Sequence, residues 1–282
     1  MLDKKLKFIT LALAVLVACL AYAVLVSRSD YLKVDFFDVG QGDSAFIETP
    51  SGWQVLIDGG PDSTVVSKLG QVMPAWDRSL DVVVATHPEA DHIAGLIEVL
   101  KNYKVDYVVE TGMAKDTEVS RAWAEAVKNE GAKVIYADGP KRVLFGQDAY
   151  MDLLWPLTNH KDEVNPKPNN FAVVSKLHYG QRIFLFTADI ERWTEQQIIS
   201  RGINVKSDVL KIGHHGSKTS SSEVFLGIVD QQTAVISVGK NNKYGHPNTS
   251  VLQRLSASDA LVLRTDKEGD IILRSDGKNI FR

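Results

Sequence analysis

The chain has 282 residues, of which 44% are hydrophobic and 24% charged, and its formal net charge at pH 7 is −3. A chain of this length can bury a substantial core, and its slight acidity excludes a general electrostatic trap for nucleic acid. The single cysteine, Cys19, lies in the apolar N-terminal stretch. Disulfides and thiolate zinc sites are therefore excluded from the rest of the chain.

Residues 1–29 are predicted to be a membrane anchor or signal segment. Three lysines near the N-terminus precede Phe8–Val26, an uncharged run just long enough to span a bilayer as a helix. We favour an uncleaved single-pass anchor in the cell membrane, with the lysines in the cytoplasm and the remaining domain outside it. Two alternatives stay open: cleavage at 21–23, which gives a secreted domain, and a lipoprotein box that ends at Cys19.

Residues 33–282 are predicted to form one α/β domain, because helical and strand-like patterns alternate along most of this range. The prolines and asparagines of Pro156–Asn170 indicate a polar loop or lid within that domain. Helices are expected at Val65–Met73, His92–Tyr103, Glu118–Asn129 and Glu191–Ser200. Strands are expected at Lys33–Asp38, Ala45–Thr49, Trp53–Ile57, Leu80–Thr86, Val105–Val109, Lys133–Tyr136, Phe171–Leu177, Ile183–Thr187, Val209–Ile212 and Ala234–Val238, with shorter pieces in Arg142–Trp155.

The loops between the first strands hold two further features. Gly40 and Gly42 let the backbone adopt positive φ and approach another element closely, although a plain hairpin turn is the alternative. Asp58 follows the strand that ends at Ile57. A carboxylate there can accept a hydrogen bond from a metal-ligating histidine, and a simple turn residue is the alternative.

Thr86–Leu96 lies where a predicted strand passes into a predicted helix, and it carries four candidate metal ligands within six positions. His87, Glu89, Asp91 and His92 supply two imidazoles and two carboxylates. A strand-to-helix turn can direct alternate side chains and the first helical residue into one pocket. The segment is therefore predicted to bind metal.

The second half of the chain adds ligand-type side chains, again after predicted strands. Asp189 follows one strand, His214 and His215 follow the next between two glycines, and His246 lies in a polar loop after a third. Side chains at strand ends can converge at one edge of a sheet, so these residues are predicted to join the first cluster. A helix N-cap is the alternative for Asp189.

The spacing His87-x-Glu89-x-Asp91-His92 resembles the metal motif of the metallo-β-lactamase fold. Over about residues 33–282 the chain is similar to the extracytoplasmic hydrolase domain of the ComEC competence proteins. The ComEC channel is not matched, because one apolar run cannot form a polytopic pore. The resemblance implies a four-layered αββα sandwich with metals at one edge between two sheets. Its other matching segments are 38–44, 56–60, Asp189, 213–218 and 244–247.

The resemblance also implies how the ligands are shared. By position, His87 and Glu89 hold a first divalent ion, Asp91 and His92 hold a second, and Asp189 bridges them. Whether one or two ions bind stays open, as does the choice between the two adjacent histidines. The full set of predicted ligands is His87, Glu89, Asp91, His92, Asp189, and His214 or His215.

Two departures from the family pattern bear on the identity of the metal. The superfamily usually has histidine where this chain has Glu89, and a further expected histidine is replaced by Asn169 and Asn170. Oxygen-rich coordination makes Mn²⁺ plausible beside Zn²⁺. Asp43 and Asp58 are expected to support the ligands from behind.

A bound divalent ion lowers the pKa of water to roughly 7, which favours hydrolysis. Asp91 is expected to orient that water, and His246 to contact the substrate or to protonate the leaving group. No serine or cysteine nucleophile is needed for this chemistry.

A basic rim of the site is predicted from Lys218, Lys240 and Lys243, with Lys211 in the same group of loops. It favours an anionic substrate, best a phosphodiester, and the resemblance suggests DNA. The alternative is that these lysines only make exposed loops soluble.

Three functions compete at this point. The first is an extracytoplasmic metal-dependent phosphodiesterase or nuclease. The second is a metallohydrolase acting on another bond, such as a lactam, a lactone or a phosphorylcholine ester of the cell surface. The third is a binding module that keeps the fold without the chemistry, against which Asp91, His92 and Asp189 argue because they are present.

Overall fold

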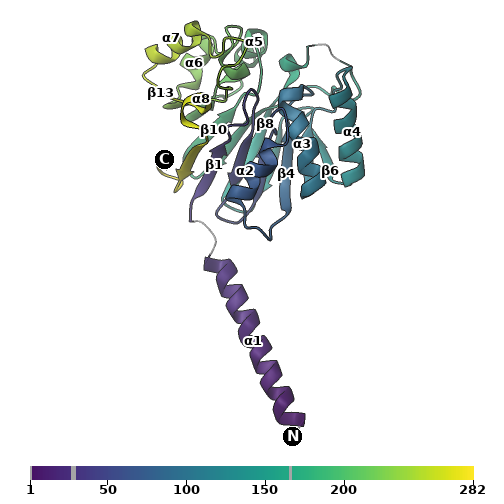
Figure 1. The fold of residues 1–282 in the computed structure, drawn as a ribbon. Coiled ribbons are helices and arrows are strands. Elements are labelled where there is room, and N and C mark those ends of the chain that lie inside the picture. The colour runs from purple at the N-terminus through teal and green to yellow at the C-terminus, as the bar shows by residue number, and fades with distance from the viewer. Residues whose placement is uncertain (1, 27–29, 165–166) are drawn as a thin grey trace.

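The computed structural model describes residues 2–26, 30–164 and 167–282, and within the first range the side chains of 4–18 (Figure 1). The predicted anchor falls in helix α1 (Leu2–Val26). Its part from Cys19 onward, with both alternative processing sites, lies outside the described side chains. When only the described residues are considered, every helix is either too short or too polar to span a bilayer.

Two sheets form the centre of the domain. The first has eight strands in the order β15-β14-β1-β2-β3-β4-β5-β6, and the second has seven in the order β13-β12-β11-β10-β9-β8-β7, counted over the described residues. The first comprises β1 (Leu32–Phe36), β2 (Ala45–Glu48), β3 (Gln54–Ile57), β4 (Ser79–Ala85), β5 (Lys104–Glu110), β6 (Lys133–Tyr136), β14 (Ile271–Ser275) and β15 (Ile280–Phe281). The second comprises β7 (Lys141–Phe145), β8 (Ala149–Trp155), β9 (Val174–Tyr179), β10 (Arg182–Phe186), β11 (Val209–Lys211), β12 (Thr233–Ile236) and β13 (Leu261–Arg264).

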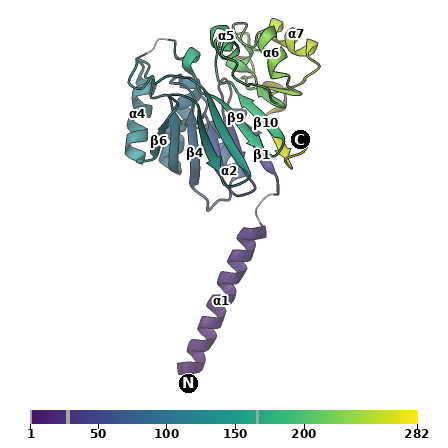
Figure 2. The ribbon, with the colours of Figure 1, turned by 180° about the vertical axis from the view of Figure 1, so that it is seen from behind.

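Helices cover the outer face of each sheet, as the two opposite views show (Figures 1 and 2). The first sheet carries α2 (Thr64–Val72), α3 (Ala90–Asn102) and α4 (Glu118–Glu130), and the second carries α5 (Arg192–Ser200), α6 (Glu223–Val229) and α7 (Thr249–Ala257). Short helices α8 (Thr265–Glu268), η1 (Pro168–Phe171) and η2 (Gly213–Gly216) complete the described elements. The two-sheet α/β sandwich expected from the sequence is therefore confirmed.

The alternation of side chains along the strands produces three buried clusters. In β1, Val34 and Phe36 face the cluster between the sheets, whereas the next residue, Phe37, faces the cluster under α2 and α3. The rings of Phe36 and Phe186 stack across the two sheets with centroids 5.9 Å apart. A third cluster fills the space between the second sheet and its helices.

Parallel strands determine where the functional loops lie. In the first sheet β3, β4, β5 and β6 are parallel, and in the second β10, β11, β12 and β13 are parallel. The loops that leave β4, β10, β11 and β12 at their carboxyl ends meet at one edge of the sandwich, which is where ligands bind in sheets of this kind. The candidate metal ligands lie in these loops or, for Asp91 and His92, in the first turn of the helix that follows β4.

The sequence-based elements match the structure well in the first two thirds of the chain. One strand differs: the strand predicted at Phe171–Leu177 begins at Val174, because Pro168–Phe171 forms a 3₁₀ turn. The C-terminal elements α6, α7, α8, β13, β14 and β15 have no counterpart in the sequence-based prediction.

Candidate metal centre

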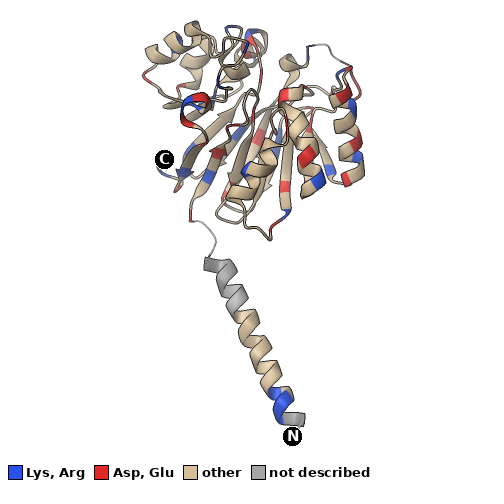
Figure 3. Ribbon diagram, viewed as in Figure 1, with Lys and Arg blue, Asp and Glu red and all other residues tan. Residues whose placement is uncertain are grey.

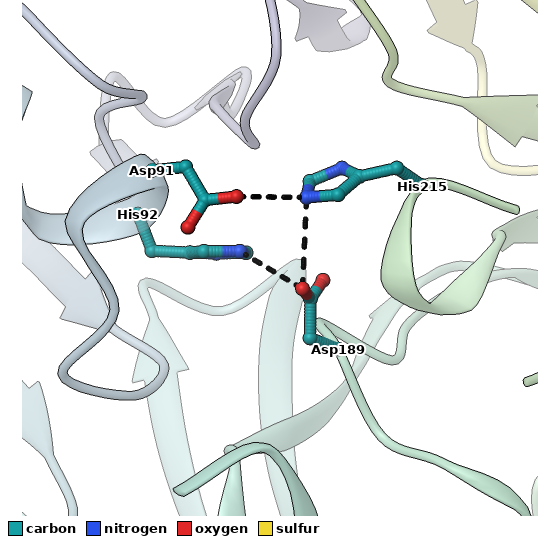
Figure 4. A group of neighbouring side chains, drawn as sticks. All are labelled: Asp91, His92, Asp189 and His215. Carbon is teal, nitrogen blue, oxygen red and sulfur yellow. Dashed lines mark hydrogen bonds and ion pairs between the residues drawn. The ribbon is translucent and has the colours of Figure 1, made fainter. Parts of the chain in front are cut away.

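Four side chains converge where the two sheets meet at this edge (Figure 4). Asp91 and His92 lie in the first turn of α3, Asp189 follows β10, and His215 lies in η2. The Asp189 Oδ2 atom lies 3.4 Å from His92 Nε2 and 3.5 Å from His215 Nε2, and Asp91 Oδ2 lies 3.2 Å from the same His215 nitrogen. One potential ligand atom from each of the four residues falls within 4.8 Å of the others.

His87 and His92, which follow β4, are both oriented by the carboxylate of Asp58. His92 Nδ1 donates to Asp58 Oδ2 at 2.8 Å, which is the contact expected for Asp58. Thr86 Oγ1 donates to the same oxygen at 2.8 Å, so His87 Nδ1 can donate in turn to that hydroxyl at 3.0 Å. Because both Nδ1 atoms donate, both Nε2 atoms are free to bind a metal.

His215 is oriented from the opposite side by the second sheet and by a loop of the first. Its Nδ1 donates to the Ser237 carbonyl at 3.0 Å and lies 3.1 Å from Asp43 Oδ1. The Asp43 carboxylate also accepts from the buried Lys211 ammonium. The predicted place of Lys211 in a basic rim is therefore wrong, because this side chain points inward and pairs with Asp43.

The backbone at η2 is strained in a way that serves the site. His214 and His215 have φ of +49° and +52°, in the left-handed region that residues other than glycine rarely adopt. This conformation places His215 in the cluster, while the Nε2 atom of its neighbour His214 lies 3.7 Å from Asp189 Oδ2. Both imidazoles therefore lie close to the same Asp189 oxygen, at 3.7 and 3.5 Å.

A glycine holds the opposite wall close. A Cβ on Gly42 would run into the carbonyl oxygen of Asp91, and the next amide, of Asp43, donates to that oxygen at 3.2 Å. The expected close approach at this glycine is thus present. It fixes the β1–β2 loop against the first turn of α3, where two candidate ligands lie.

Buried atoms without partners test whether a metal fits. The Nε2 atoms of His87 and His92 and the Oδ1 atom of Asp189 are buried and have no hydrogen-bond partner among the described residues. Buried polar atoms are nearly always paired, so three such atoms together point to a missing ligand. Imidazole nitrogens with carboxylate oxygens suit Zn²⁺ and Mn²⁺, so the residues present fit a divalent ion.

The local charges agree with that interpretation. Burial, followed by the charge of His92, lowers the pKa of His87 to about 3, so its imidazole is neutral at pH 7. Burial alone would raise the pKa of Asp189, but His215 and His92 hold it well below its ordinary value. Conversely, burial would lower the pKa of His92, but Asp189 and Asp58 raise it. The buried carboxylates therefore attract positive charge to this cluster.

Glu89 lies beside the four-residue cluster rather than in it. It lines the same cavity, of about 190 Å³, but both of its carboxylate oxygens accept from Lys115 Nζ, at 2.6 and 2.7 Å. The cavity is also lined by Asn169, one of the two asparagines at which the resemblance led us to expect a further histidine. His246 lines it too, and burial, followed by His214, lowers the pKa of its imidazole.

The three predicted rim lysines lie outside this cavity. Lys218, Lys240 and Lys243 are exposed, and none of them is among the described residues that line the metal cavity. Lys243 Nζ lies 5.4 Å from the ring centroid of Tyr244, which does line it. Figure 3 shows basic and acidic residues interspersed on the helices α3 and α4.

Sequence reasoning missed two residues that line the cavity and one residue that holds the lining residue Glu89. Gln41 and Tyr244 line it, and Lys115 holds Glu89 from a loop 26 positions away. The glycines on either side of Gln41 were a usable signal, because they mark a loop that approaches the site closely. Nothing in the local sequence around Lys115 indicates its partner.

The comparisons with known proteins agree with this geometry. Residues 37–240 match the Metallo-beta-lactamase superfamily. The chain is 34% identical over 265 residues to ComE operon protein 3 of Bacillus subtilis (strain 168), covering 86% of this chain and 33% of that protein. It is 29% identical over 248 residues to Competence protein ComA of Neisseria gonorrhoeae, covering 84% and 31%. The chain thus spans about a third of the length of these curated relatives.

A solved structure shows the same fold at low sequence identity. CmlA, a diiron beta-hydroxylase from Streptomyces venezuelae, has a TM-score of 0.56 with 14% identity, covering 86% of this chain and 54% of that chain. The sequence match, the two-sheet sandwich and the His/Asp cluster at its edge agree with one another. The chain belongs to the metallo-beta-lactamase superfamily.

Proposed function

We propose that this protein is an extracytoplasmic metal-dependent phosphodiesterase that hydrolyses DNA. The observation that carries the proposal is the set of unpaired, buried ligand atoms of His87, His92 and Asp189 beside an open polar cavity. When bound there, one or two divalent ions, Zn²⁺ or Mn²⁺, supply activated water near neutral pH and stabilise negative charge on the attacked centre.

The protein side chains have distinct tasks in this proposal. Asp91 is the most exposed member of the four-residue cluster, with 35% of its side chain accessible, so it can orient the attacking water. His246 lines the same cavity and contacts the substrate. The rigid Asp58 and Asp43 carboxylates hold the imidazoles in place, so the site needs little rearrangement during the reaction.

Two observations support DNA as the substrate. The similarity to Competence protein ComA and ComE operon protein 3 covers most of this chain. The cavity is strongly polar, with three carboxylates, three imidazoles and two amides among its lining groups, which suits a charged substrate better than a lactam.

The test is hydrolysis of single- and double-stranded DNA by the purified protein after chelation, and again after Mn²⁺ or Zn²⁺ is restored. We expect cleavage only with metal, and a loss of at least about 100-fold in His87→Ala, because removing a ligand exceeds the loss typical of an outer partner. The thermal unfolding of His87→Ala should show a folded domain. Wild-type activity in this variant would refute the site, and metal binding without DNA cleavage would redirect the search to other esters.

The extracytoplasmic location is part of the proposal and rests on residues 1–29. The lysine-rich start followed by Phe8–Val26 supports it. Protease added to intact cells should digest the domain, whereas a cytoplasmic marker protein should survive. Protection of the domain until the cells are lysed would contradict this location.

A further inference from the structure

A second cavity, of about 520 Å³, opens on the outer side of the second sheet. Three separate segments line it. Glu191, Arg192 and Trp193 come from the start of α5, Lys218 from the loop after η2, and Arg254 from α7. None of the described residues that line this cavity belongs to the four-residue cluster of the metal centre.

Cationic side chains dominate the second cavity. The guanidinium of Arg254 is held by donating to the carbonyls of Ser221 and Ser220 at 2.8 and 3.0 Å. Burial lowers its pKa, and the cation Arg192, which lines the same cavity, lowers it further. The side chain of Lys218 adds a third positive charge. Guanidinium and ammonium groups gathered in this way suit the oxygens of a phosphate.

Among the described residues that line the second cavity, Glu191 is the one carboxylate, and it is already engaged. Glu191 Oε1 accepts from Thr219 Oγ1 at 2.9 Å and lies 3.6 Å from His214 Nδ1. Because His214 lines the metal cavity, the two cavities meet at this pair. An extended substrate can therefore occupy both cavities at once.

Trp193 supplies an aromatic surface next to the cations. Its side chain is 45% exposed and lines the second cavity. Trp155 and Phe171 contact it edge-on, with ring centroids 6.2 and 5.9 Å away and interplanar angles of 76° and 61°. These contacts hold the indole in place and leave part of it accessible. An accessible, fixed indole beside cations is the arrangement on which single-stranded bases stack.

We infer that the second cavity binds one nucleotide of a single-stranded nucleic acid, with its phosphate on Arg192, Lys218 and Arg254 and its base on Trp193. The inference rests on the proposed phosphodiesterase function and narrows it, since the neighbouring phosphodiester then lies at the metal centre. A duplex keeps its bases stacked and paired, so it cannot offer one to Trp193. The site therefore selects single strands.

The test measures binding to the full-length protein by fluorescence anisotropy, with metals chelated so that cleavage is absent. The probes are a short fluorescein-labelled oligothymidylate, a duplex of equal length and an abasic strand of equal length. The variants are Trp193→Ala and the double variant Arg192→Gln with Lys218→Gln. Lys206→Gln is the matched control, because Lys206 is an exposed cation that pairs with Asp230 and is not among the described residues that line the second cavity.

We expect Trp193→Ala to weaken oligothymidylate binding by roughly tenfold and to leave abasic binding unchanged, because only the base contacts the indole. The double variant should reduce the slope of log K against log salt by about 0.7 for each cation removed. Lys206→Gln should leave both quantities as in the wild type. If Trp193→Ala does not fold, Trp193→Leu and the double variant carry the same comparison.

Unchanged oligothymidylate binding in Trp193→Ala, or tighter wild-type binding to duplex than to single strand, would overturn the inference. Metal-restored cleavage by the wild type distinguishes this failure from failure of the proposed function. Cleavage with normal binding by both variants refutes the nucleotide site alone. No cleavage, with binding that depends on Trp193, refutes the phosphodiesterase and leaves the nucleotide site in place.

Discussion

Asp58 orients two candidate ligands with one carboxylate. Its Oδ2 accepts from His92 Nδ1 directly and from the Thr86 hydroxyl that His87 Nδ1 contacts. Its Oδ1 accepts from the Thr86 amide at 2.9 Å, which fixes the carboxylate itself. The tautomers of both imidazoles therefore depend on a single buried anion.

Replacing Asp58 by Asn should weaken metal binding while the domain stays folded. An amide nitrogen in place of one oxygen faces an Nδ1–H donor, which disfavours the tautomer that leaves Nε2 free. We expect Asp58→Asn to lower Zn²⁺ or Mn²⁺ affinity by about 10- to 100-fold in competition with a chromophoric chelator. Asp276→Asn, which changes an exposed carboxylate in the last turn, should bind metal like the wild type. Equal affinities in all three proteins would show that Asp58 does not support the site.

Asp35 provides a test of stability away from the site. It is fully buried in β1 and pairs with Lys33 at 3.0 Å, and burial raises the pKa of its carboxyl despite that pairing. A folded-state pKa above the unfolded value means that its contribution to stability is complete below the unfolded pKa and is lost as pH rises through the folded pKa.

The neutral variant Asp35→Asn should escape that loss. Its unfolding free energy relative to the wild type should therefore increase from about pH 4 upward, by about 1.4 kcal/mol for each unit by which the two pKa values differ. Urea unfolding at several pH values measures the difference. Parallel profiles for the two proteins would show that Asp35 has the same pKa in both states.

For single residues, the sequence predicted which site residues converge, because they follow strands. It did not predict contacts between loops that lie far apart in the chain. His92, Asp189 and His215 were expected to converge because each follows a strand, and the structure brings them together. The inward direction of Lys211 was not predictable, because its partner Asp43 lies 168 positions away in the other sheet. The same is true of the Lys115 side chain that holds Glu89.

Among the elements, the β1–β2 loop shows how a glycine positions a site. Gly42 has no room for a Cβ next to the Asp91 carbonyl, whereas Gly70 in α2 has nothing within 4 Å of the position a Cβ would take. Replacement by alanine should therefore have opposite effects at the two glycines. One is required by close packing, and the other only adds flexibility to a helix.

Gly42→Ala should lower the unfolding free energy by about 1–3 kcal/mol, because the added methyl forces the loop away from α3. Gly70→Ala should raise it by up to about 1 kcal/mol, because alanine favours a helix interior. Guanidinium unfolding measures both. An unchanged or higher unfolding free energy in Gly42→Ala would show that the β1–β2 loop moves freely away from α3.

The elements near the C-terminus illustrate the limit of local patterns. β14 pairs with β1, so that Leu32 lies opposite Ser275 although almost the whole domain separates them in the chain. Strand pairing over such a distance is decided by the assembled core and not by neighbouring residues. By contrast, β4 and α3 can be recognised from the local spacing of apolar residues. Their bounds were predicted to within two residues.

At the scale of the molecule, the candidate centre joins the two halves of the sandwich. Asp91 and His92 belong to the first half, and Asp189 and His215 to the second. An ion held by all four residues would therefore link two halves that are also joined by apolar packing, such as Phe36 on Phe186, and by the buried Lys211–Asp43 ion pair.

Metal should for this reason stabilise the whole domain. Binding to the folded state alone adds about 2.7 kcal/mol to the unfolding free energy at a free metal concentration of 100 times Kd. We expect thermal unfolding to shift upward with Mn²⁺ or Zn²⁺ and downward on chelation. Asp189→Asn should lose this response and Asp230→Asn, an exposed carboxylate on another surface, should keep it. A metal-dependent shift in Asp189→Asn equal to that of the wild type would contradict the bridging role.

The four ligands lie in the loops and in the first helical turn that follow the strands, and the strands themselves contain none of the four. A change of length or residue type in the outer parts of those loops, such as 240–245, therefore leaves the strand register untouched. Substrate preference can in this way change during evolution while the four candidate metal ligands stay the same. The second cavity is lined by other residues, so we expect relatives to differ in sequence there more than at the four ligands.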